Sequence, residues 1–167
     1  MNKTSLILIR IDDRLIHGQV VTAWVKHLDI NKIVIVDDDA YKDDFLKGVL
    51  KMVAPSGINL EILSREKAEQ SIKEFPEKSR TMVLVKTPQT AEFLHDKGLE
   101  FKELNVGGIG SRPDRKVLYR NISINQDEFE VLKNFAEKGI KVYCQAVPSD
   151  KPVDITELNF YKKNTGR

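Results

Sequence analysis

Short apolar runs recur along this chain and alternate with segments of helical spacing. The runs are rich in β-branched residues and cover 5–11, 32–36, 59–63, 81–85, 103–106, 117–124 and 140–145. Strands that alternate with helices in this way are typical of βαβ units. We therefore expect an α/β fold with an open, mainly parallel sheet of about seven strands and helices on both faces. With no linker or repeat in sight, residues 1–167 are expected to form a single domain.

Several of the intervening segments carry specific helix signals. The apolar residues of 46–53 repeat at the spacing of one helix face. Ser64 has the type and place of an N-cap for a helix that includes 68–75, and Gly139 those of the glycine after a helix at 129–136. Residues 117–124 follow a loop rather than a helix, so we expect an edge or antiparallel strand there.

Composition limits the classes of function. The 27 basic residues nearly balance the 25 acidic ones, and no basic run occurs, which argues against nucleic acid as a partner. The single cysteine, Cys144, is predicted to be a core residue of a strand in a reducing compartment. The apolar run at 6–9 is too short for a signal peptide or a membrane span. We expect a cytoplasmic protein that contacts the membrane only through partners.

The loop after the first strand holds the residues best suited to chemistry. In open parallel sheets, ligands bind beyond the carboxyl ends of the strands. His17 lies there, at the start of a helix whose buried face includes Trp24. The field at a helix N-terminus favours an anion and disfavours an imidazolium, so we expect a neutral, nucleophilic His17.

Neighbouring residues of this loop complete the arrangement. Arg14 offers a planar cation that suits phosphate oxygens. Asp12 or Asp13 is placed to accept a hydrogen bond from the second imidazole nitrogen, which would fix the tautomer. Gly18 leaves room for a bulky group to approach. Together these residues predict a functional site centred on a histidine nucleophile.

This loop also carries a resemblance to a known family. Residues 10–24, RIDDRLIHGQVVTAW, resemble the phosphorylation-site signature of the IIB components of the mannose/fructose/sorbose family of the sugar phosphotransferase system. The segments 86–88 (KTP), 104–108 (LNVGG) and 145–148 (QAVP) resemble later landmarks of that family, in the same order. The resemblance therefore spans essentially the whole chain.

The resemblance implies a phosphotransferase that works as a relay. A phosphohistidine on a IIA partner would phosphorylate His17, which would pass the phosphoryl group to a sugar arriving through the membrane components IIC and IID. It implies no metal and no organic cofactor. The sugar, the phosphorylated nitrogen and the presence of a homo-oligomer are left open. It implies that Arg14, Asp12 and Thr87 bind or support the phosphoryl group, and to these we add Asp13, Gly18 and Gln19 of the His17 loop.

Three other functions compete with this hypothesis. The run 37–39 (DDD) after a strand is compatible with a metal-dependent phosphatase, although a solvated loop and helix cap is favoured. The glycines of 107–110 resemble half of a dinucleotide-binding fingerprint, but a tight loop that approaches a neighbouring site is favoured. A regulatory domain that uses the His17 loop only as an interaction surface is the third. His27 and His95 are expected at helix ends or on the surface.

Overall fold

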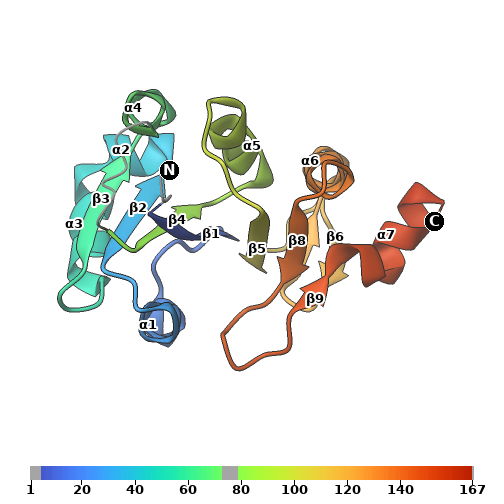
Figure 1. Ribbon diagram of the computed structural model, residues 1–167, viewed down its shortest axis with the longest axis horizontal. Helices are drawn as coiled ribbons and strands as arrows, with labels where there is room; N and C mark the ends of the chain where they lie inside the picture. The colour runs from blue at the N-terminus through green and yellow to red at the C-terminus, as the bar shows by residue number, and fades with distance from the viewer. Residues whose placement is uncertain (1–4, 73–78, 167) are drawn as a thin grey trace.

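A seven-stranded sheet runs through the molecule, whose computed structural model describes residues 5–72 and 79–166. Its order is β3-β2-β4-β1-β5-β8-β9, and every neighbouring pair is parallel except β8 with β9 (Figure 1). The expected α/β fold is confirmed. The strands are β1 (Leu6–Asp12), β2 (Lys32–Val36), β3 (Asn59–Leu63), β4 (Thr81–Val85), β5 (Glu103–Gly108), β8 (Lys141–Cys144) and β9 (Val153–Asp154).

Helices cover both faces of the sheet. In Figure 1, α1 lies below the sheet, whereas α4, α5 and α6 lie above it. None of the helices in the described ranges is long and apolar enough to cross a membrane. The helices are α1 (Gly18–Leu28), α2 (Asp38–Lys42), α3 (Asp44–Val53), α4 (Arg65–Ser71), α5 (Pro88–Asp96), α6 (Gln126–Glu137) and α7 (Asn159–Thr165), with a 3-10 turn at Ile155–Glu157.

Two predicted helix ends are confirmed. The Ser64 hydroxyl accepts a hydrogen bond of 3.1 Å from the amide of Lys67 and so caps α4. Gly139 follows α6 with φ of 86°, the left-handed conformation that favours glycine after a helix. The end of the helix predicted around 68–75 lies partly outside the described residues.

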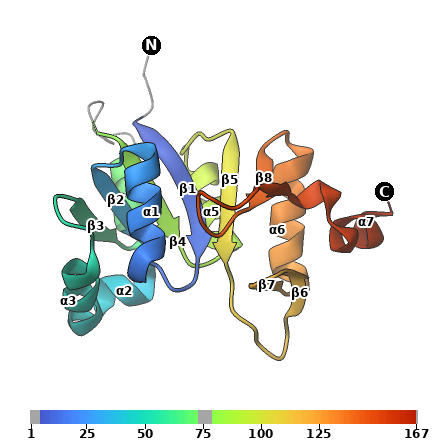
Figure 2. The same cartoon turned by 90° about the horizontal axis from the view of Figure 1, so that it is seen from below.

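The prediction for 117–124 needs a correction. This segment is antiparallel, as expected, but it is two strands rather than one, and neither belongs to the main sheet. β6 (Lys116–Tyr119) and β7 (Ile122–Ile124) form a separate hairpin, turning at Arg120, whose φ is 45°. The turn was not predicted because residues 117–124 were interpreted as one apolar run and therefore as one strand. Figure 2 shows the hairpin beyond the carboxyl end of β5, and the unpredicted β9 takes the seventh place in the sheet.

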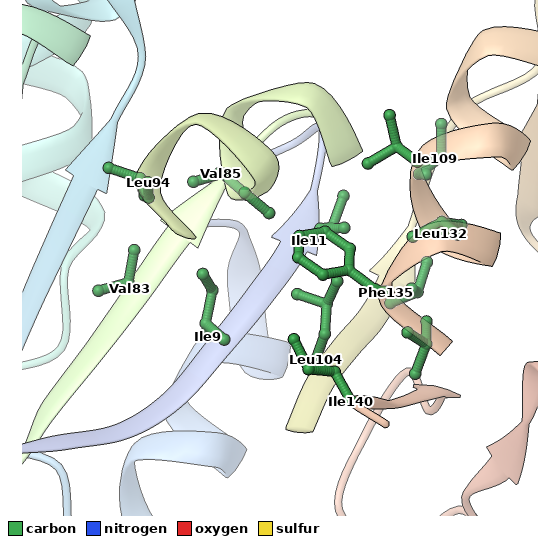
Figure 3. Close-up of a cluster of buried hydrophobic side chains, with 14 of the residues drawn as sticks. Ile9, Ile11, Val83, Val85, Leu94, Leu104, Ile109, Leu132, Phe135 and Ile140 are labelled. Carbon is green, nitrogen blue, oxygen red and sulfur yellow. The ribbon is translucent and has the colours of Figure 1, made fainter. Parts of the chain in front are cut away.

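Strand β1 is central and has two different buried faces. Ile9 and Ile11 point into a hydrophobic cluster on the side of α5 and α6 (Figure 3). Arg10 and Asp12 alternate with them, and their side chains are only 1% and 0% exposed. Since successive residues of a strand point to opposite faces, both charges lie on the side of α1, below the sheet. The site is built on this polar face.

Candidate functional site

His17 is placed by the turn that links β1 to α1. The amide of Leu15 donates to the carbonyl oxygen of Asp12 at 3.0 Å, and Leu15 itself adopts a left-handed φ of 56°. Leu15 and Ile16 are buried, so they anchor the turn in the apolar cluster between α1 and the sheet. His17 is the N-cap residue of α1, as expected from its sequence position, but its side chain makes no capping bond. The imidazole instead reaches back to the end of β1.

The imidazole meets the buried carboxylate of Asp12. His17 Nε2 lies 3.0 Å from Asp12 Oδ2, and the amide and Nε of Arg14 donate to Oδ1 at 3.1 and 3.2 Å. Burial alone would raise the pKa of Asp12, but hydrogen bonds from Arg14 and His17 and the charge of Arg10 hold that pKa below its usual value. Asp12 is therefore ionised and can only accept. When the imidazole is neutral, His17 therefore donates through Nε2–H, and the lone pair of Nδ1 is free.

Asp13 has a different task. Its Oδ2 accepts a hydrogen bond of 2.7 Å from the amide of Gly110, and its own amide donates to the carbonyl of Gly108 at 3.1 Å. Of the two aspartates that the sequence offered as partners for His17, the structure selects Asp12. Asp13 fastens the His17 loop to the segment that follows β5.

Arg10 belongs to the site although sequence reasoning left it out. Its Nη1 donates to Asn105 Oδ1 at 2.6 Å and to the Gln145 carbonyl at 2.9 Å. Its Nη2 donates to Asp12 Oδ2 at 3.1 Å and to the Ala146 carbonyl at 2.9 Å. The guanidinium thus joins β1, β5 and the segment after β8 underneath the His17 loop.

Spacing along β1 was the signal that could have identified Arg10. In the sequence, Arg10 directly follows the apolar run at 6–9. Arg10 and Asp12 are two residues apart in a strand, so they had to share one face. A charge in a strand that is buried on both faces needs a partner of opposite sign, and Asp12 was the nearest one.

Glycines give the two arginines the space they occupy. A Cβ atom at Gly107 would collide with the guanidinium of Arg10, and one at Gly108 would lie 3.0 Å from Arg14 Nη2. The predicted close approach to a neighbouring site is therefore confirmed, but Gly107 and Gly108 are the last residues of strand β5 rather than part of a loop. A nucleotide site on these glycines is disfavoured, because arginine side chains already fill the space beside them and a hairpin, not a helix, follows.

Comparison with known proteins identifies the family. The family model for the sorbose subfamily IIB component of the phosphotransferase system (PTS) matches residues 6–166. The chain belongs to this family. As a PTS IIB component it transfers phosphoryl groups during sugar uptake, working with IIA and with the membrane components IIC and IID, and the resemblance stated from the sequence is confirmed.

Individual relatives agree with this assignment. The sorbose-specific EIIB component of Klebsiella pneumoniae is 31% identical over 92% of this chain and 94% of the relative. The mannose-specific EIIAB component of Escherichia coli K12 is 31% identical over 90% of this chain but only 47% of its own length. The crystal structure of the IIBSor domain from the Klebsiella pneumoniae sorbose permease superposes with a TM-score of 0.85 at 30% identity, covering 96% of each chain.

Gly18, Gln19 and Thr87 are the remaining residues of this IIB component that were assigned to the phosphoryl group. Gly18 has a left-handed φ of 46°, and a Cβ there would meet no atom within 4 Å. Gln19 is exposed on the first turn of α1. Thr87 caps α5, its hydroxyl accepting from the Thr90 amide at 3.3 Å, and no contact found in the described ranges links it to His17. The functional roles of these residues stay predictions.

The aspartate run after β2 serves the structure of this IIB component. Asp37 accepts from the Ala40 amide at 2.9 Å and caps α2, as the favoured interpretation held. Asp37 also pairs with Lys86 at 3.3 Å, and Asp38 accepts from the Arg65 amide at 2.8 Å. The expected loop is in fact the short helix α2, because this cap starts one. Within residues 5–72 and 79–166, no cluster of histidine, cysteine or acidic side chains is arranged to hold a metal ion.

Cys144, His27 and His95 lie within strands and helices of the fold. Cys144 is buried in β8, as predicted, and burial raises the pKa of its thiol to about 12, with a smaller contribution from Asp154. His27 and His95 lie in the last turns of α1 and α5. His95 also packs its ring against Phe101, with 5.2 Å between centroids.

Proposed function

We propose that His17 is the residue of this IIB component that carries the phosphoryl group, and that Nδ1 is the atom that binds it. One observation supports both parts of the proposal. The Nε2 atom of His17 lies 3.0 Å from the buried carboxylate of Asp12, which two arginines keep ionised. This bond turns the imidazole so that its remaining nitrogen is the nucleophile.

In the first step, the lone pair of His17 Nδ1 attacks the phosphorus of the IIA phosphohistidine. The new N–P bond forms as the N–P bond of the donor breaks, and the donor imidazole takes the released electron pair. His17 keeps its Nε2 proton throughout. Asp12 stabilises the positive charge that develops on the ring, as the carboxylate partner of a catalytic histidine does.

In the second step, the phosphoryl group leaves for a sugar hydroxyl. The hydroxyl oxygen attacks the phosphorus as the N–P bond breaks, its proton passes to water, and the electron pair of the N–P bond returns to Nδ1. Because Nε2 is still protonated, His17 leaves as a neutral imidazole rather than an anion. The single hydrogen bond between His17 and Asp12 therefore assists both steps of the relay.

The surrounding residues neutralise charge and support the loop. The Arg14 side chain is 48% exposed, so its guanidinium can turn from Asp12 to the phosphoryl oxygens. Gly18 and Gln19 lie at the N-terminus of α1, where backbone amides attract anions, and Asp13 holds the loop in place. Thr87 follows β4, which pairs with β1. Its hydroxyl is the last group that we assign to binding the phosphoryl group.

We also propose the setting in which this relay works. The protein acts in the cytoplasm and is drawn to the inner face of the cell membrane by IIC and IID. The sugar that enters through these components is the phosphoryl acceptor. Selection of that sugar is assigned to the membrane components, since the chemistry at His17 requires only a hydroxyl group.

The test is phosphorylation of the purified chain by phosphoenolpyruvate, the general phosphocarrier relay and a IIA component. Wild type is expected to take up one acid-labile phosphate, which ³¹P and ¹⁵N NMR place on Nδ1. His17→Ala is expected to take up none while keeping its melting temperature. His27→Ala, the loss of an exposed histidine on α1, is the control and should label normally. Full labelling of His17→Ala would overturn the assignment, and phosphate on Nε2 would overturn the choice of nitrogen.

A further inference from the structure

We propose that Arg10 is a positioning residue for the relay: it fixes Asp12, and through Asp12 the Nε2–H donor of His17, and glycine at 107 provides the space this requires. The inference rests on the proposed function of His17 as phosphoryl carrier. Arg10 touches neither His17 nor its phosphoryl group in the proposed mechanism. Its effect passes through Asp12 alone.

The contacts of Arg10 restrict its guanidinium to one position. The side chain is 1% exposed, and its two terminal nitrogens reach Asn105, two main-chain carbonyls of residues 145–146, and Asp12. The centre of the guanidinium lies 5.4 Å from the ring centroid of Trp24, whose Nε1 donates to the Ala146 carbonyl at 3.0 Å. A side chain held on so many sides cannot turn without breaking several of these bonds.

Arg14 contrasts with Arg10 at the same carboxylate. Both arginines donate to Asp12, but the side chain of Arg14 is 48% exposed and that of Arg10 is 1% exposed. When Arg14 turns toward an arriving phosphoryl group, Asp12 loses one of its cations. Arg10 stays in place and keeps the carboxylate ionised and oriented toward His17. The two arginines therefore divide the work between a mobile partner of the phosphoryl group and a fixed support.

Gly107 shows that the backbone makes room for this support. Gly107 lies within β5, and its φ is outside the left-handed region, so no backbone conformation there requires glycine. The requirement comes from Arg10, since a Cβ at position 107 would occupy the place of its guanidinium. A methyl group at this position should displace Arg10 from Asp12 while leaving every charge of the site in the chain.

The experiment observes the His17 Nε2 proton directly. In wild type, the bond to Asp12 should slow exchange of this proton with water enough to give a ¹H–¹⁵N NMR signal. Gly107→Ala and Arg10→Lys are expected to lose this signal through at least tenfold faster exchange. Both should slow phosphoryl transfer from IIA about tenfold to a hundredfold, the usual cost of losing a support behind a reacting group.

Two control variants separate positioning from general destabilisation. Gly48→Ala is the same substitution on α3, where a Cβ meets no atom within 4 Å, and it should keep the Nε2 signal and the transfer rate. Arg115→Lys breaks a different buried arginine–carboxylate pair, that with Glu128, and should lower the melting temperature while keeping the signal. The double variant Arg10→Lys/Gly107→Ala should be no slower than the worse single variant, because both changes remove one contact.

Clear results overturn the inference. It is wrong if Gly107→Ala keeps both the slow Nε2 proton and the wild-type transfer rate. It is also wrong if the signal is lost in Arg115→Lys to the same extent as in Arg10→Lys. Failure of the proposed function looks different, because wild type itself would then take up no phosphate on His17, while the Nε2 proton would still report on Arg10.

Discussion

Two buried arginine–carboxylate pairs serve different ends: Arg10 pairs with Asp12 on β1, and Arg115 pairs with Glu128 across the β6–β7 hairpin in the sequence. Arg10 and Asp12 are joined by one bond of 3.1 Å, with side chains 1% and 0% exposed. Arg115 and Glu128 are joined by two bonds of 2.9 Å, with side chains 6% and 2% exposed. Burial and chemistry are therefore nearly the same in the two pairs.

The difference lies in what else each carboxylate holds. Glu128 uses its remaining capacity on the amide of Asn125, at 3.0 Å, to close the capping box of α6. Asp12 uses its remaining capacity on Arg14 and on His17, whose side chain is 23% exposed. A buried ion pair that is saturated by the main chain stabilises the fold. One that extends a bond to the partly exposed His17, the proposed nucleophile, takes part in the proposed reaction.

Asp12→Asn should break this contrast most severely. The amide removes the negative charge that orients and stabilises His17 and leaves Arg10 buried without a counter-ion. We expect transfer from IIA to fall about ten-thousandfold, as when a catalytic histidine loses its carboxylate partner. The free energy of unfolding should fall by about 3 kcal/mol. Single-turnover phosphorylation and urea unfolding measure the two effects, and a wild-type rate would show that Asp12 is only structural.

Arg14→Ala should separate activity from stability within the same cluster. Because Arg14 is half-exposed, its loss costs the fold little, about 1 kcal/mol or less. The developing phosphoryl charge loses its cation, so we expect transfer to slow about a hundredfold. Labelling by phosphorylated IIA, quenched at successive times, gives the rate of transfer. Unchanged kinetics would remove Arg14 from the proposed mechanism.

Glu128→Gln should produce the opposite pattern at the second pair. Arg115 becomes a buried cation without its carboxylate, and the cap of α6 weakens, so we expect a loss of about 3 kcal/mol in the free energy of unfolding. Transfer from IIA should stay within about twofold of wild type under conditions where the variant is folded. A loss of transfer without loss of stability would contradict the distinction between the two pairs.

Acid should reveal the smallest effect, the ionisation of Asp12. Its folded-state pKa is lowered, so its charge contributes stability above the unfolded pKa of about 3.9 and that contribution is lost as the pH falls through the folded value. The stability of wild type should therefore fall more steeply below about pH 4 than that of Asp12→Asn. Thermal melts from pH 5 downward test this, and parallel curves would show that Asp12 contributes nothing to the pH dependence.

The sequence allowed the fold class and the centre of the site to be predicted, because both depend on local patterns. Apolar runs gave the parallel strands, and the position of His17 before an apolar helical face gave the N-terminus of α1. The hairpin at 116–124 and the role of Arg10 depend on contacts between distant segments. Neither the bond from Asn121 Nδ2 to the Gly107 carbonyl, at 3.1 Å, nor the contacts of Arg10 with 145–146 leave a periodic trace in the sequence.

The alternation of β1 has a consequence for how this chain tolerates insertions. Ile9 and Ile11 pack above the sheet, while Arg10 and Asp12 lie below it. Insertion or deletion of one residue before position 9 could be absorbed by the start of the strand. The same change between Ile9 and Asp12 would exchange the faces, burying a carboxylate among isoleucine partners and an isoleucine beneath His17. The same four consecutive side chains therefore determine both the packing of β1 and the proposed site for phosphoryl transfer. A shift of register among them would disrupt both.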